Sequence, residues 1–154
     1  MTQETYWKIK PQWTFGSKSQ FIRLTIDACF THKEKDYWIP QCYECDGASI
    51  PKFAWYIVGT PTEGDNIFAA FAHDPLYLSH ALPRKESDIV ARNLWLQTDK
   101  PKYQVAMIYR TLRIAGYPAW VNSTNDKLDL AIMCNLIKQR PIEEQEKFKT
   151  LWPI

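Results

Sequence analysis

The sequence predicts an α+β domain, in which a small N-terminal antiparallel β-sheet packs against a C-terminal bundle of about four α-helices. Three segments before Pro51 alternate apolar and polar residues and are rich in β-branched and aromatic side chains, which is typical of strands. After Pro51 the apolar residues recur at helical spacing. Because the strands precede the helices instead of alternating with them, the order favours α+β over a parallel α/β sheet.

The predicted sheet has three strands. Two of them cover residues 21–30 (FIRLTIDACF) and 36–45 (DYWIPQCYEC), with the charged segment THKEKD between them as a hairpin loop. The third covers residues 6–15 (YWKIKPQWTF). Pro11 has no N–H to donate to a neighbouring strand, so this third strand belongs at an edge of the sheet.

The first predicted helix lies in residues 64–80 (GDNIFAAFAHDPLYLSH), where Asp65 or Asn66 suits the N-cap position. Pro75 disfavours the helical conformation of Asp74. Either the helix ends near Asp74, or a second turn begins with the proline at its first position.

The remaining elements are three further helices and a short amphipathic tail, over residues 83–97, 101–116, 125–140 and 141–152. In the first of these helices, Ile89, Leu94 and Trp95 are expected to face the core. The next helix opens on Pro101 and closes on Gly116, the order in which these residues usually bound a helix.

Composition limits the class of protein. A chain of 154 residues suits one domain, and 45% hydrophobic with 23% charged residues is ordinary for a soluble protein. The net charge of +2 has no basic block, so no nucleic-acid partner is expected. The N-terminus lacks the pattern of a secretory signal, and the apolar stretches are shorter than the ~20 residues of a membrane span. We expect a soluble protein that is made in a cytoplasm.

Cys42 and Cys45 have the spacing of half a zinc site. A structural zinc site needs two more ligands, and the sequence has no second pair at matching spacing. We therefore interpret these cysteines as reduced thiols on a strand.

The seven tryptophans divide into two groups. Four lie at strand or helix spacing and are expected in the core: Trp38, Trp55, Trp95 and Trp120. Trp7, Trp13 and Trp152 lie near the termini, where a core position and a contact with another protein are both open.

Four polar residues stand in apolar surroundings, namely Asp46, His73, Asp74 and Asp88. In the structural interpretation, Asp46 accepts backbone hydrogen bonds in a turn, Asp88 lies at the positive end of its helix, and His73 finds a partner in the core. In the functional interpretation, all four meet where the sheet joins the helices. We favour the structural interpretation, because ion pairs in a core bury the same residue types.

The functional interpretation has two versions. An imidazole beside carboxylates can hold a divalent metal, with His73, Asp74 and Asp46 as ligands. Without metal, His73 is a general base oriented by a carboxylate, and Ser49 is a distant candidate nucleophile. The motifs G-x-S-x-G and H-E-x-x-H and a Gly-rich phosphate loop are absent from the sequence. Whether the chain is an enzyme therefore stays open, and a divalent metal is the sole cofactor considered.

Four segments carry a resemblance to a known family. DGASIPKF, FAAFAHDPLY, RKESDIV and AMIYRTLRIAGYPAW follow one another between Asp46 and Trp120. In order and spacing they resemble the phage and prophage proteins grouped as domain of unknown function 1353. The family-like region is about residues 20–120, followed by a helical extension over residues 121–154. The resemblance carries over these signature positions: Asp46, Ser49, Pro51, His73, Asp74, Leu76, Tyr77 and Asp88.

One departure concerns Pro75, where the family usually has a larger, often aromatic residue; it affects the backbone after Asp74. The resemblance implies a bacteriophage origin without an established activity. We expect a virion or morphogenesis component, at the tail or the head-to-tail region, that contacts other phage proteins; whether it forms an oligomer in the virion stays open. The alternative is a small hydrolase that uses the Asp/His cluster, for example on the cell envelope. The first is favoured, because no catalytic motif is complete and the terminal tryptophans suit an interface.

Overall fold

The computed structural model describes residues 4–17, 21–45, 59–60, 64–123 and 127–154. The described strands are β1 (Thr5–Ile9), β2 (Trp13–Phe15), β3 (Ile22–Leu24), β4 (Ala28–His32), β5 (Lys35–Ile39) and β6 (Glu44–Cys45). The described helices are α2 (Gly64–Ser79), α3 (Arg84–Trp95), α4 (Lys102–Ala115), α5 (Tyr117–Ser123), α6 (Lys127–Lys138), α7 (Ile142–Gln145) and the 3-10 helix η2 (Glu146–Phe148). Strands precede helices, so the predicted α+β class is confirmed.

Each predicted strand is divided between two sheets. One antiparallel sheet has the order β1-β4-β5 and the other has the order β2-β3-β6. The predicted strand over residues 6–15 supplies β1 and β2, the next supplies β3 and β4, and the last supplies β5 and β6. The same three-stranded meander thus runs through both sheets and bends between them. The predicted edge position of the first strand is confirmed in both sheets.

The bend between the two sheets lies where the three long strands of the meander are interrupted. Pro11 and Pro40 lie at two of the three breaks, and neither has an N–H for a ladder. At the remaining break, between β3 and β4, the Thr25 N–H donates to the Gln12 carbonyl across 2.8 Å. The hairpin between β4 and β5 is tighter than predicted, because two residues with positive φ, Lys33 and Glu34, complete its turn.

Helix α2 continues through Pro75, contrary to both predicted alternatives. A proline inside a helix costs roughly 3 kcal/mol, because it removes a hydrogen bond and crowds the preceding turn. Phe71, one turn before the proline, and Leu76, directly after it, are fully buried. Each gains about 1.5–3 kcal/mol on burial, which offsets the cost of the proline. Asp65 lies in the first turn of α2 and Asn66 follows it, so neither is the N-cap that we predicted.

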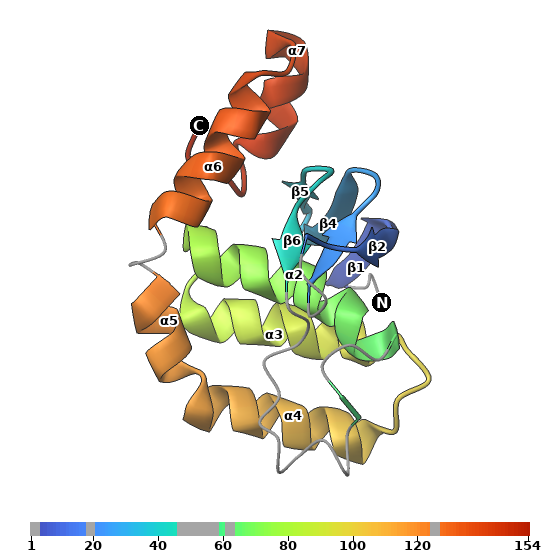
Figure 1. Ribbon diagram of the computed structural model, residues 1–154. Coiled ribbons are helices and arrows are strands. Elements are labelled where there is room, and N and C mark those ends of the chain that lie inside the picture. The colour runs from blue at the N-terminus through green and yellow to red at the C-terminus, as the bar shows by residue number, and fades with distance from the viewer. Residues whose placement is uncertain (1–3, 18–20, 46–58, 61–63, 124–126) are drawn as a thin grey trace.

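The helices form layers over the sheets. Figure 1 shows α4, α3 and α2 stacked in that order beneath the strands, with α6 and α7 rising at one side. Helices α3, α4 and α6 begin and end within two residues of their predicted limits, whereas α5 was not predicted as a separate helix. Leu94 and Trp95 are buried as expected, and Ile89 is half-buried.

The C-terminal segment closes the core from the side of β5. Phe148, Leu151 and Trp152 are buried, and the Trp152 indole donates to the carbonyl of Trp38 across 2.9 Å. The guanidinium of Arg140 forms two hydrogen bonds with the carboxylate of Asp27, at 2.6 and 2.8 Å. The segment after the family-like region therefore packs in the same core as the sheets.

The expectations about the terminal tryptophans, the paired cysteines and membrane spans can be compared with the described part of the chain. Trp152 is buried, and Trp7 and Trp13 are half-buried against the core, so of the two alternatives left open for the terminal tryptophans the structure favours the core position. Cys42 and Cys45 are not joined in a disulfide. In the described ranges, no helix has both the length and the apolar character needed to span a bilayer.

Candidate functional site

A buried ionic cluster joins three helices. The carboxylate of Asp88, on α3, is inaccessible to solvent. Its Oδ1 accepts hydrogen bonds from His73 Nε2 at 2.9 Å and from the Tyr77 hydroxyl at 2.6 Å, both on α2. Its Oδ2 accepts from Arg113 Nη1 of α4 at 2.6 Å. We call His73, Tyr77, Asp88 and Arg113 the Asp88 cluster.

The sequence places these side chains for local reasons. His73 and Tyr77 are four residues apart on α2, so they lie on one face of the helix, and their rings are 4.1 Å apart between centroids. Asp74 follows His73 and is partly exposed; its Oδ1 lies 3.8 Å from Nδ1 of the imidazole. The imidazole therefore has a carboxylate on each side.

Electrostatics favours the charged forms of His73 and Asp88. Burial lowers the pKa of His73, but hydrogen bonds and charges from Asp74 and Asp88 outweigh burial and hold its pKa above the usual 6.5. Burial likewise raises the pKa of Asp88, but its partners His73, Tyr77 and Arg113 outweigh burial and bring its pKa below the usual 3.8. An imidazolium and a carboxylate thus face each other at neutral pH.

The hydroxyl of Tyr77 stays protonated in this setting. Burial raises its pKa, and the neighbouring Asp88 carboxylate raises it further. Gly116 lies against the same hydroxyl and against the backbone of Leu112, since a Cβ at this position would be 3.0 Å from the hydroxyl and closer still to the Leu112 carbonyl oxygen. The φ of Gly116 is −78°, so this glycine is required for space rather than for a left-handed backbone.

A second ring stack closes the far end of α2. The imidazole of His80 stacks on Trp120 of α5, with 3.8 Å between centroids and 11° between planes. Trp120 also meets the edge of the Tyr77 ring at 5.1 Å. His80 adopts a φ of 54°, which turns the chain out of α2 at this point. The Asp88 cluster is therefore covered by α5 as well as by α4.

Some predicted site residues meet and others cannot be assessed. The structure brings His73 to Asp88 and places Asp74 beside His73. Asp46, Ser49 and Pro51 lie outside the described residues, so the meeting of Asp46 with His73 stays a prediction. Among the residues that the structure describes, no three His, Cys, Asp or Glu side chains form a group able to hold a metal ion. The metal site that includes Asp46 also stays a prediction.

Sequence reasoning missed Arg113 and identified Tyr77 only as a signature position of the family, without a contact to Asp88. The spacing of four residues between His73 and Tyr77 was a usable signal. The sequence has no comparable signal for Arg113, because the contact of Arg113 with Asp88 depends on how α4 packs against α3.

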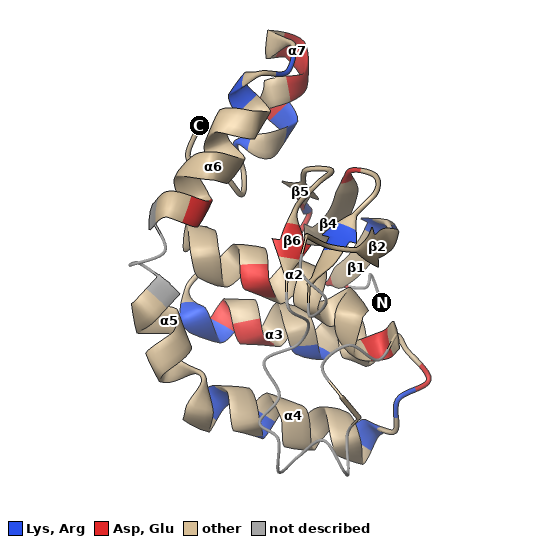
Figure 2. Ribbon diagram, in the orientation of Figure 1, with Lys and Arg blue, Asp and Glu red and all other residues tan. Residues whose placement is uncertain are grey.

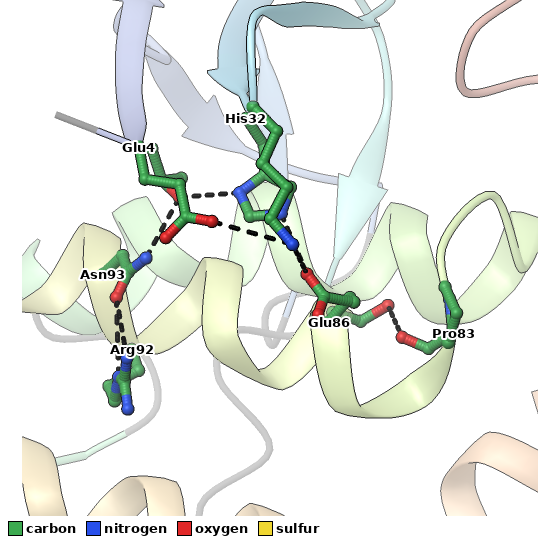
Figure 3. A network of polar contacts seen from close by, with 9 residues as sticks. Glu4, His32, Pro83, Glu86, Arg92 and Asn93 are labelled. Atoms are coloured by element: carbon green, nitrogen blue, oxygen red, sulfur yellow. Dashed lines mark hydrogen bonds and ion pairs between the residues drawn. The ribbon is translucent and has the colours of Figure 1, made fainter. Parts of the chain in front are cut away.

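A second polar network was also missed (Figure 3). The buried imidazole of His32, on β4, lies between Thr5 and Glu86: its Nδ1 is 2.8 Å from Thr5 Oγ1 and its Nε2 is 3.1 Å from a Glu86 carboxylate oxygen. Asn93 donates to the same Thr5 hydroxyl at 3.1 Å, and Lys33 donates to Glu86 at 2.9 Å. The network fastens β1 and β4 to α3.

One assignment of hydrogens satisfies the His32 network. Thr5 Oγ1 accepts from Asn93, so its own hydroxyl hydrogen can be donated to His32 Nδ1. Nε2–H of His32 then donates to Glu86. A shallow pocket of about 260 Å³ lies beside this network and is lined by Glu4, Thr5, Asn93, Leu96 and Gln97. Thr5 is only 1% exposed, which keeps its hydroxyl from acting as an open nucleophile.

Fold and cluster together define a small α+β protein whose helices are joined by a buried ion pair. Residues 22–112, more than half of the chain, match the family described as "Protein of unknown function (DUF1353)". The chain belongs to this family, which confirms the family resemblance of the sequence. No curated protein and no solved structure matches the chain.

Proposed function

We propose that this chain is a structural protein of a bacteriophage, a virion or morphogenesis component at the tail or the head-to-tail region, that acts through contacts with other phage proteins. The phage assignment is supported by the sequence resemblance described above. In this proposal the Asp88 cluster is a structural connection between helices rather than a reaction centre.

The observation that carries the proposal is the row of apolar side chains on the outside of α6. Leu128, Ile132 and Leu136 follow one another at intervals of four residues and are 72%, 47% and 40% exposed. Ile142 of α7 is 76% exposed. Large apolar side chains in a row on the surface mark sites of protein contact more often than isolated ones do.

The enclosure of the Asp88 cluster supports the same proposal. His73 is 3% exposed and Asp88 is not exposed at all. Both oxygens of Asp88 already accept hydrogen bonds from protein donors. A substrate would have to displace these donors to reach the carboxylate, and leaving them unpaired in the core is costly.

One observation favours the alternative, a small hydrolase. His73 has a carboxylate near each ring nitrogen and a raised pKa, which suits a general acid. His73→Gln separates the two roles, because a hydrolase then loses cleavage of cell-envelope material while it stays folded. A structural role for the cluster predicts lower stability and no such cleavage even by the wild-type chain.

The deciding experiment is quantitative mass spectrometry of phage particles, purified by density gradient and washed with high salt. We expect the chain at a fixed number of copies per particle. Its absence from intact particles and from assembly intermediates alike would contradict the proposal. Detection of envelope cleavage by the purified chain, lost in His73→Gln, would instead support the hydrolase.

A further inference from the structure

The outward face of α4 is apolar, like its inward face. The inward residues pack against the core and are buried: Val105, Ile108 and Leu112. The outward residues are exposed and form what we call the outer α4 row: Tyr103, Met107, Arg110 and Ile114. The three apolar members are 63%, 38% and 82% exposed, in chain order. A helix with its inner face already packed therefore presents a second apolar face to solvent.

The spacing of the outer α4 row is that of a helix–helix seam. Its members follow one another at intervals of four, three and four residues. Side chains at alternating intervals of four and three residues, as at the core positions of a heptad, form one continuous line on a helix and pack into the holes of a partner helix. Tyr117 and Val121 of α5 extend the exposed apolar surface beyond the end of α4, at 60% and 42% exposed.

The charged side chains within residues 100–123 are all basic, and one of them, Arg113, is paired with Asp88. Residues 100–123 contain four basic residues, Lys100, Lys102, Arg110 and Arg113, and no Asp or Glu. Figure 2 shows the basic positions of α4 without an acidic one between them. Arg110 lies between Met107 and Ile114, and within the described residues its side chain makes no ion pair. A complementary surface must supply a carboxylate at this point.

We propose that the outer α4 row binds an amphipathic helix of another protein, with apolar residues at heptad spacing and a carboxylate opposite Arg110. A second copy of this chain fits less well. Arg110 is close to the middle of the row, so two copies paired antiparallel would bring their Arg110 side chains together. Residues 100–123 of the second copy would offer no acid to separate the two like charges.

This inference rests on the proposed function, since it names the surface and the chemistry of one contact. The two can fail separately. The chain can be present in particles and yet not bind through α4, in which case only the present inference is wrong.

The test uses the full chain and two synthetic three-heptad peptides, both with leucine at the core positions. One has Glu opposite the position of Arg110 and the other has Lys there. Fluorescence anisotropy should show that the wild-type chain binds the Glu peptide at least about tenfold more tightly than the Lys peptide. Arg110→Glu should reverse this preference. Circular dichroism and thermal unfolding of each variant confirm that it is folded, which we expect because Arg110 is exposed.

A matched pair of variants tests the apolar part of the row. Ile114→Ser should weaken binding of the Glu peptide at least about tenfold, because a buried apolar anchor is lost. Phe15→Ser should leave binding unchanged, although Phe15 is nearly as exposed, at 80% against 82%.

Four results would overturn the inference. They are no binding of either peptide, equal binding of both, self-association in sedimentation velocity that Ile114→Ser abolishes, and binding to phosphatidylglycerol vesicles that exceeds binding to the Glu peptide. The third result would assign the row to a second copy of the chain, and the fourth would assign it to a lipid surface.

Discussion

Replacing Asp88 by alanine removes the one acceptor shared by three helices. His73 and Tyr77 of α2 would lose their common partner, and Arg113 of α4 would lose its only carboxylate contact in the described part of the chain. His73 is buried and held in its charged form, so the substitution leaves a cation in the core. The protein can relieve this cost by releasing the proton, but the tyrosine hydroxyl then still lacks an acceptor.

The size of the effect follows from these contacts. Removing one member of a buried ion pair typically costs ~3–5 kcal/mol, because the other charge stays buried without a partner. Asp74 stays 3.8 Å from His73 in the Asp88→Ala variant, so we expect a loss near the lower end of this range. For a domain of this length, that loss corresponds to a fall in melting temperature of roughly 6–20 °C. Asp88→Asn should cost less than Asp88→Ala, because the amide oxygen can still accept from Tyr77, while the amide N–H₂ faces the donors of Arg113.

Urea unfolding followed by tryptophan fluorescence at neutral pH measures these losses. Asp99→Asn is the control: Asp99 is exposed in the loop after α3, so its substitution should change the free energy of unfolding by less than about 0.5 kcal/mol. If Asp88→Ala is as harmless as the control, the reasoning about the cluster fails, and the ion pair has no role in stability.

Three further substitutions or conditions test the polar contacts. The stabilisation that comes from the charged form of His73 is complete below pH 6.5, its ordinary pKa, and is lost as pH rises through its higher folded pKa. Urea unfolding between about pH 5 and pH 9 should show this loss. His73→Gln should remove the pH dependence. Gly116→Ala pushes a Cβ against the backbone carbonyl of Leu112 and against the Tyr77 hydroxyl, and should lower stability by ~1–3 kcal/mol in thermal unfolding. Thr5→Val leaves His32 Nδ1 without its partner and should cost ~1–3 kcal/mol in urea unfolding.

Each of these predictions has a contrary outcome. A pH dependence that is the same in the wild type and in His73→Gln would mean that another group titrates. A stabilised Gly116→Ala variant would mean that the end of α4 and Tyr77 both shift without cost, so that the usual gain from replacing glycine dominates. An unchanged Thr5→Val variant would show that water replaces the lost hydroxyl.

The alternation of side chains was sufficient to predict the meander but not its bend. A period-two pattern runs through residues 21–30 and, with one gap at Gln41, through residues 36–45, because both halves of each strand have one face on the core. Pro11 and Pro40 each indicate a break in a strand. Only Pro11 was interpreted, as the sign of a strand at the edge of the sheet. The break at Thr25 depends on a hydrogen bond with a distant segment, which no local pattern reveals.

Proline was misleading in α2 for the opposite reason. Local preference disfavours a helix across Pro75, and the burial of Phe71 and Leu76 overrides it. The candidate site shows the same division. His73 and Asp88 stand out as polar residues in apolar surroundings, so their meeting could be predicted, whereas Arg113 and His32 find their partners only through the packing of α3 against α4 and against the sheet.

The position of the C-terminal segment has a consequence for synthesis of the chain. The strands leave the ribosome first, but Phe148, Leu151 and Trp152, which cover β5, emerge more than a hundred residues later. Until then, the meander exposes an apolar flank to solvent. We expect the nascent chain to need a holding chaperone during this interval, and the native state to form only after residue 152 has cleared the exit tunnel.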